Sequence, residues 1–313
     1  MTEIDTSTFL NQWTTQKVSY LTRDLLTYAV GIGCTDLNFV YENNKGFEAF
    51  PTYPIVLSFK GTDQDVVTFP SKAMAEGPKM PPLPGVVAGL DGERYIEKVN
   101  EMPPKGAKLI LKQRLAGVQK RGSGATVQQE AILEGEDGTV YYRMTGGTFL
   151  VGAKKGFSDS GENFAKKINA PERKPDLVEE MLVPANQAQI YRLSGDYNPL
   201  HIDHSVATSV GFPAPILHGL CTFGTACRAV LQAYTNGDPK TFKAIKVRFA
   251  SPVYPGTTLR TEMWDDENNT ENAKNGFHRV MFETKMKGEG GKKDVVVLSS
   301  SYVDFFTSGA AKM

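Results

Sequence analysis

A series of three strand-forming runs occurs twice in this chain of 313 residues. Each series follows a Pro/Gly turn, formed by residues 104–106 in the first half and by Pro255 and Gly256 in the second. The runs are rich in β-branched and aromatic residues and are separated by turn residues. They span residues 110–119, 124–134 and 139–151, and then residues 260–265, 276–287 and 294–306. The repetition predicts a divergent internal duplication built from antiparallel strands.

A long apolar helix is predicted in the second half, over residues 217–234. Its apolar residues recur at helical spacing on nearly every side, which is typical of a helix buried inside a domain. The strands that follow should therefore wrap around it. The first half has a short helix candidate at residues 24–30 but no equally apolar long one, and residues 71–84 are rich in Pro, Gly, Lys and Met instead.

Composition narrows the class of protein. Lys plus Arg and Asp plus Glu both number 35, so the formal net charge is zero, which argues against a general nucleic-acid or polybasic membrane surface. No apolar run reaches the length of a membrane span, and the polar, acidic start does not resemble a secretory signal. The cysteines, Cys34, Cys221 and Cys227, have no CxxC spacing, which suits a reducing compartment without disulfides or a zinc site.

A polar segment punctuated by Pro and Gly divides the chain. It spans residues 158–175 and is predicted to be a linker. Residues 1–157 then form an N-terminal repeat, and residues 176–313 form a C-terminal repeat that carries the candidate catalytic residues.

A carboxylate and an imidazole flank a predicted turn in the second half. Asp196 and His201 are five residues apart and cannot share a helix face, but the Asn198-Pro199 pair favours a turn that could bring their side chains together. Within reach of one water molecule, such a pair can act as general base and general acid. Asn198 could hold this geometry or fix the tautomer of the histidine. The alternative is that Asp196 only caps the turn and His201 packs locally.

Three strings carry a family resemblance: Ser194-Gly-Asp-x-Asn-Pro-Leu-His201, residues 215–224 and residues 242–256. Together they resemble the hydratase 2 family of (R)-specific 2-enoyl-CoA hydratases, which includes stand-alone enzymes and the hydratase domain of peroxisomal multifunctional enzyme type 2. Weaker similarity begins near Tyr28, so the resemblance covers nearly the whole chain. It implies an α+β double hot-dog fold, with two repeats of antiparallel sheet around a helix. The first repeat would lack a long central helix and house the acyl chain.

The resemblance also implies an activity, the reversible hydration of trans-2-enoyl-CoA to (3R)-3-hydroxyacyl-CoA in peroxisomal fatty-acid β-oxidation. We assign Asp196 to activating water and His201 to relaying the proton to C2, and the sequence leaves the reverse division open. Gly219, where the apolar helix starts, could bind the thioester oxygen through its N–H. The alternative for Gly219 is a role in helix–sheet packing. No cofactor is expected, and a homodimer is expected from the resemblance.

Coenzyme A contacts are implied for a set of residues on both halves. They are Gly92, Arg121, Asp196, Asn198, His201, His218, Gly219 and Phe249. The chain departs from the family at Asp91, where a His is common, and the pair Lys120-Arg121 stands where a Lys is common. An acid at position 91 puts a direct contact with coenzyme A there in doubt. His201 and His204 form an HxxH string, but no third ligand cluster follows, so no metal site is expected.

The last three residues, Ala311, Lys312 and Met313, resemble a peroxisomal address read by an import receptor. The alternative interpretation is that these three residues are an ordinary frayed terminus. Two other functions stay open: a hot-dog acyl thioesterase or acyl-carrier-protein dehydratase, and a non-catalytic acyl-CoA-binding protein. The Asp-x-Asn-x-x-His order speaks against the first pair, and the intact Asp-Asn-His set argues against a decayed site.

Overall fold

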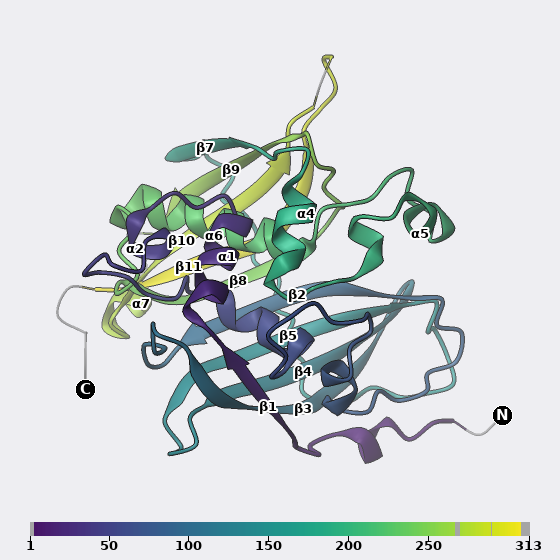
Figure 1. Ribbon diagram of the computed structural model, residues 1–313. Helices are drawn as coiled ribbons and strands as arrows, with labels where there is room; N and C mark the ends of the chain where they lie inside the picture. The colour runs from purple at the N-terminus through teal and green to yellow at the C-terminus, as the bar shows by residue number, and fades with distance from the viewer. Residues whose placement is uncertain (1–2, 267–269, 289, 308–313) are drawn as a thin grey trace.

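The computed structural model describes residues 3–266, 270–288 and 290–307. These residues form one antiparallel sheet of eleven strands, drawn in Figure 1 with the first half below the second. The first half contributes β1 (Thr14–Tyr20), β2 (Ala88–Lys98), β3 (Ala107–Arg121), β4 (Gly124–Glu134), β5 (Val140–Val151) and the two-residue β6 (Ser160–Gly161). The second half contributes β7 (Leu177–Leu182), β8 (Phe242–Phe249), β9 (Thr258–Asp265), β10 (Phe277–Met286) and β11 (Val295–Phe306).

The strand order repeats the duplication seen in the sequence. It runs β1-β3-β4-β5-β2 and then β8-β11-β10-β9-β7, so the second half has the order of the first in reverse. The halves meet where β2 pairs with β8, with Ile96 opposite Ile245. Each of the six strand runs predicted from the sequence is a strand, and β4 begins and ends at the predicted residues. The topology confirms the predicted double hot-dog fold.

The predicted apolar helix is α6 (Gly219–Thr235), which begins and ends within two residues of its expected bounds. It lies against β8, β9, β10 and β11 of its own half. Ten of its residues are buried, which explains why nearly all of its faces are apolar. None of the helices in the described part of the chain is long and apolar enough to span a membrane.

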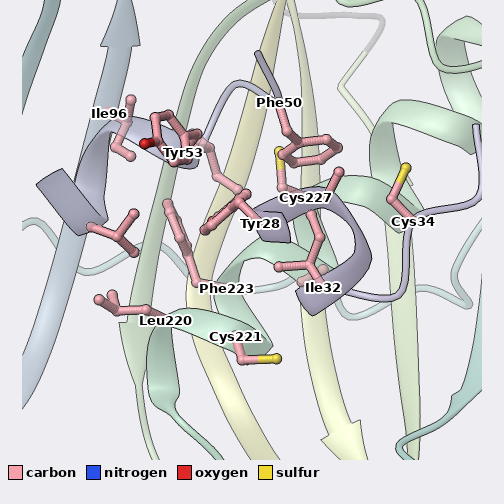
Figure 2. Close-up of a cluster of buried hydrophobic side chains, with 14 of the residues drawn as sticks. Tyr28, Ile32, Cys34, Phe50, Tyr53, Ile96, Leu220, Cys221, Phe223 and Cys227 are labelled. Atoms are coloured by element: carbon pink, nitrogen blue, oxygen red, sulfur yellow. The ribbon is translucent and has the colours of Figure 1, made fainter. Parts of the chain in front are cut away.

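The C-terminal end of the short helix of the first half, α1 (Thr22–Gly31), contacts the helix of the second half (Figure 2). Gly224 lies at this contact, because a Cβ there would come within 2.6 Å of Cγ2 of Ile32 and 3.0 Å of the Tyr28 hydroxyl. The Sγ of Cys221 donates to the Gly31 carbonyl at 3.3 Å. With 10 residues against the 17 of α6, α1 confirms that the first half lacks a long central helix.

Short helices complete the fold. Those of the first half are η1 (Thr6–Phe9), α2 (Leu37–Val40), η2 (Tyr53–Val56), α3 (Leu57–Lys60) and η3 (Ala73–Glu76). Those of the second half are α4 (Gln187–Tyr191), η4 (Arg192–Ser194), η5 (Pro199–His201), α5 (His204–Ser209) and α7 (Thr270–Lys274). The proposed linker, residues 158–175, contains β6, which pairs with β3, and Ile168, whose N–H donates to Ser300 in β11 at 3.3 Å.

Candidate active site

Two successive turns bring the predicted acid–base pair together. The N–H of Asn198 donates to Oδ1 of Asp196 at 3.2 Å, and Oδ1 of Asn198 accepts from the N–H of Leu200 at 3.0 Å. The second bond caps η5, which ends at His201. Asn198 therefore holds the turn, as one of its two expected roles requires. Asp196 also caps the turn, as the alternative for this residue proposed.

A backbone carbonyl fixes the tautomer of His201. Nδ1 of the ring lies 2.9 Å from the carbonyl oxygen of Ile216, which can only accept, so Nδ1 carries the hydrogen. The neutral ring then has an unprotonated Nε2. Burial lowers the pKa of His201 to about 4, so the ring is neutral at physiological pH. The tautomer is thus fixed by Ile216 and not by Asn198.

Asp196 is a buried carboxyl, 7% exposed. Burial is the main cause that raises its pKa to about 6, and the nearby charge of Asp91 raises it further, whereas the Asn198 N–H and Arg192 lower it. One ligand-type atom from each of Asp196, His201 and His218 lies within 4.8 Å of the other two. A single water molecule can therefore bridge Asp196 and His201.

His218 packs against both Asp196 and His201. Its ring stacks on that of His201, with centroids 3.7 Å apart at 29°. Nε2 donates to the backbone carbonyl of Asp196 at 3.1 Å, and burial lowers the pKa of His218 well below its usual range. Nδ1 is buried and has no partner among the described residues. The structure places His218 against both members of the pair, outside the lining of the cavity that they face.

That cavity, here called the catalytic cavity, has a volume of about 320 Å³. Of the predicted residues it brings together Asp196, Asn198, His201, Gly219 and Phe249. The remaining wall is mostly apolar, with Phe59, Leu90, Phe212, Leu217, Leu220, Val253 and Leu298 among its residues. A mainly apolar cavity with a few converging polar groups is typical of a site for a small organic ligand.

Gly219 is the first residue of α6 and lines the catalytic cavity. N–H groups in the first turn of a helix have no partner within the helix and lie at the positive end of its dipole. A Cβ at this position would lie 3.3 Å from Cε1 of Phe249, so glycine lets that ring lie against the start of the helix. The N–H can therefore stabilise an oxygen that becomes negatively charged.

Besides His218, two further predicted binding residues, Gly92 and Arg121, lie outside the lining of the catalytic cavity. Gly92 is the extra residue of a β-bulge, and its neighbour Asp91 lines the cavity instead. Arg121 ends β3, where its guanidinium donates to Asn163 at 3.3 Å. Both remain predicted contacts for a larger ligand that extends beyond the cavity.

Among the lining residues that were not predicted as site residues, Thr222 and Asp91 are polar. Thr222 is 2% exposed, and its hydroxyl has no partner among the described residues. For Asp91 the sequence indicated only a departure from the residue that is common in the family at this position. The spacing of Thr222 three residues after Gly219 was the available signal, because the two lie on one helix face.

The grouping of Asp196, His201 and His218 could also hold a metal ion. The sequence offered only His201 and His204 as ligands, and His204 instead begins the exposed end of α5. His201 and His218 each use one ring nitrogen in a bond to a carbonyl oxygen, which leaves one nitrogen each. The expectation of no metal therefore stays a prediction.

Comparison with known proteins gives the class and then the family. Residues 166–285 match the model of the MaoC like domain, and residues 18–152 match that of the MFE-2 hydratase 2 N-terminal domain. A solved structure described as a MaoC-like dehydratase from Phytophthora capsici is 37% identical, with a TM-score of 0.87, and the alignment covers 99% of this chain and 100% of that one. The fold and site define a MaoC-like double hot-dog protein.

Peroxisomal enoyl-CoA hydratase 2 of Arabidopsis thaliana is 36% identical over 310 residues, which cover 91% of this chain and 93% of that protein. The chain belongs to the hydratase 2 family. The peroxisomal multifunctional enzyme type 2 of Drosophila melanogaster is 38% identical over 92% of this chain. The chain spans 46% of the length of that larger protein.

Proposed function

We propose that the chain is an enzyme that catalyses the reversible hydration of trans-2-enoyl-CoA to (3R)-3-hydroxyacyl-CoA in peroxisomal β-oxidation. The observation that carries this proposal is the arrangement of Asp196, His201 and the Gly219 N–H around one cavity. An acid–base pair beside a donor for a developing oxyanion is what the addition of water to an enoyl thioester requires. Family relatives named enoyl-CoA hydratase 2 support it.

In this mechanism the Gly219 N–H binds the thioester oxygen, and one water molecule donates a hydrogen to Asp196 and another to Nε2 of His201. The water oxygen forms a bond to C3, the C2–C3 π electrons move toward the thioester oxygen, and one water proton passes to the enzyme. The resulting enolate then takes that proton at C2. No cofactor is proposed, because proton transfer needs no hydride carrier.

The pKa values favour Asp196 as the group that takes the proton. Asp196, with a pKa of about 6, is a stronger base than His201, with a pKa of about 4. Because Nε2 of His201 starts without a proton, the ring can relay one to C2 only after receiving it from the water. His201 would then mainly orient the water.

The direct test is to mix the purified chain with crotonyl-CoA, follow the loss of the enoyl absorbance and determine the configuration of the product. We expect conversion to the (3R)-hydroxyacyl thioester. Release of free coenzyme A without a hydroxyacyl product would indicate a thioesterase. Binding without turnover would indicate a non-catalytic acyl-CoA-binding protein.

The pH dependence of kcat/KM should have an acid limb near pH 6, because Asp196 must be ionised to accept a proton. Asp91→Asn should move this limb to lower pH. The substitution removes a negative charge that raises the pKa of Asp196 and frees the positive charge of Arg94, and both changes lower that pKa. The measurement is a pH profile of kcat/KM, with Glu97→Gln on the same strand as the control. An unchanged limb in Asp91→Asn would contradict the proposed role of Asp196.

The proposed location depends on Ala311, Lys312 and Met313, which lie outside the described residues. A fluorescent protein fused at the N-terminus should enter peroxisomes, and deletion of the three residues should release it to the cytosol. The measurement is co-localisation with a peroxisomal marker in both versions. If the intact fusion stayed in the cytosol, the proposal that an import receptor recognises this tail would have to be dropped. The proposed hydration chemistry would be unaffected. A homodimer remains part of the proposal.

A further inference from the structure

Thr222 of α6 carries a buried hydroxyl that has no hydrogen-bond partner among the described residues. Threonine hydroxyls in helices commonly donate to the carbonyl four residues back. Those of Thr27, Thr208 and Thr235 do so, at 2.7 to 2.9 Å. For Thr222 that carbonyl belongs to His218, which already accepts two backbone N–H groups. A buried hydroxyl without a partner lowers stability, so its presence in the wall of a cavity points to a function.

The position of Thr222 places it beside the predicted oxyanion donor. Thr222 and Gly219 both line the catalytic cavity, and they lie three residues apart in α6. Helical side chains lean toward the N-terminus of the helix, so the side chain of Thr222 lies over the turn that begins with Gly219. Threonine occupies two χ1 rotamers in helices, so the hydroxyl can turn toward a ligand in the cavity.

The thioester oxygen of the substrate gains negative charge during hydration and needs hydrogen-bond donors. The ionised carboxylate of Asp196 can only accept, and so can Nε2 of neutral His201. The Gly219 N–H supplies one donor. Oxyanion sites combine such backbone N–H groups with donors from side chains. The Thr222 hydroxyl is a donor on the same helix face that is not used within the protein.

We propose that the Thr222 hydroxyl donates a second hydrogen bond to the thioester oxygen of the bound substrate and so completes the oxyanion site that starts at Gly219. This proposal rests on the proposed hydratase function. The substrate then supplies the partner that the hydroxyl lacks within the protein. The hydroxyl stabilises charge and keeps its proton throughout the reaction.

Thr222→Val removes the hydroxyl and keeps the branched shape of the side chain. It should lower kcat for crotonyl-CoA roughly 10–100-fold, because one of two oxyanion donors is lost. Thr222→Ser keeps a hydroxyl and should retain most of the activity. The Val variant should be at least as stable as the wild type in denaturant unfolding, because no hydrogen bond within the protein is lost.

Thr225 provides a matched control in the same helix. It is 4% exposed against 2% for Thr222, and it does not line the catalytic cavity. Its hydroxyl donates to the Ile32 carbonyl at 3.3 Å. Thr225→Val should therefore lower the free energy of unfolding and leave kcat near the wild-type value, which is the opposite of the result expected for Thr222→Val.

A binding experiment isolates the thioester oxygen without turnover. Butyryl-CoA carries this oxygen, whereas the thioether S-butyl-CoA lacks it. Thr222→Val should raise the Kd of butyryl-CoA roughly three- to tenfold, the usual effect of losing one neutral hydrogen bond. The Kd of S-butyl-CoA should stay at the wild-type value. Isothermal titration calorimetry measures both.

Wild-type kcat in Thr222→Val would overturn the proposal. Equal losses of affinity for both ligands would also overturn it, because Thr222 would then act through packing or through the neighbouring His218. A loss of stability as large as that of Thr225→Val would show that the hydroxyl has a structural role instead. Failure of the wild type to hydrate any enoyl-CoA would refute the proposed function itself, and the role of Thr222 with it.

Discussion

Asp196→Asn and His201→Gln should each lower kcat for hydration by roughly 10²–10⁴-fold, because the first variant loses the general base and the second loses the Nε2 acceptor that orients the water for it. Asn keeps an oxygen that can accept from the Asn198 N–H, and Gln keeps a donor for the Ile216 carbonyl, so both turns should survive. His204→Gln is the matched control for the histidine, because that side chain is exposed at the start of α5. Steady-state kinetics with crotonyl-CoA measure the effect. Near-wild-type rates in both variants would refute the assigned site.

Asp196→Asn should also make the protein more stable at neutral pH. The pKa of Asp196 is raised on folding to about 6 from 3.8, so its ionisation opposes folding. This destabilisation of the folded state is absent below about pH 4 and grows as the pH rises to about 6. Above about pH 6 it amounts to at most about 3 kcal/mol. The variant should therefore gain unfolding free energy at pH 8 but not at pH 4. Denaturant unfolding at both pH values separates this result from a general change in stability.

Gly219→Pro should lower kcat by roughly 10²–10³-fold, the usual cost of losing one oxyanion donor. Proline removes the N–H, and it is favoured at the first position of a helix. The residue before it, His218, already has an extended ψ of 130°, which suits a residue that precedes proline. The helix should therefore remain, which circular dichroism can check.

Gly219→Ala is the control for this experiment. It keeps the N–H but places a Cβ 3.3 Å from Phe249, so it should mainly affect KM through the crowded ring. Equal losses of kcat in the Pro and Ala variants would mean that crowding explains both, and the oxyanion role of the N–H would have to be dropped.

The sequence predicted the elements that have regular hydrophobic patterns. The six strand runs and α6 have them, because each buries one face or nearly all faces. β7 has no such pattern, since it is an edge strand on which Leu177 and Glu180 are alike exposed. β1, β2 and β8 were not predicted either, and in β2 the bulge at Gly92 interrupts the alternation. Edge position and bulges are properties of the assembled sheet, which local pattern does not record.

The candidate site could likewise be predicted only in part. Asp196, Asn198 and His201 could be placed together because they share one turn, and Gly219 because it starts a predicted helix. The carbonyl of Ile216 fixes the histidine tautomer. It is a backbone group, so no residue type in the sequence indicates it. The ion pair between Asp91 and Arg94 depends on the β-bulge at Gly92, so the spacing of the two residues in the sequence could not predict it.

The seam between β2 and β8 has a consequence for synthesis on the ribosome. When the first half has emerged, β2 has one partner, β5, and its other edge is open until β8 is made. α1 likewise has no α6 to contact. An open, partly apolar strand edge invites pairing with another chain, and pairings between distant segments form slowly. The nascent first half should therefore depend on chaperones for longer than its length alone suggests.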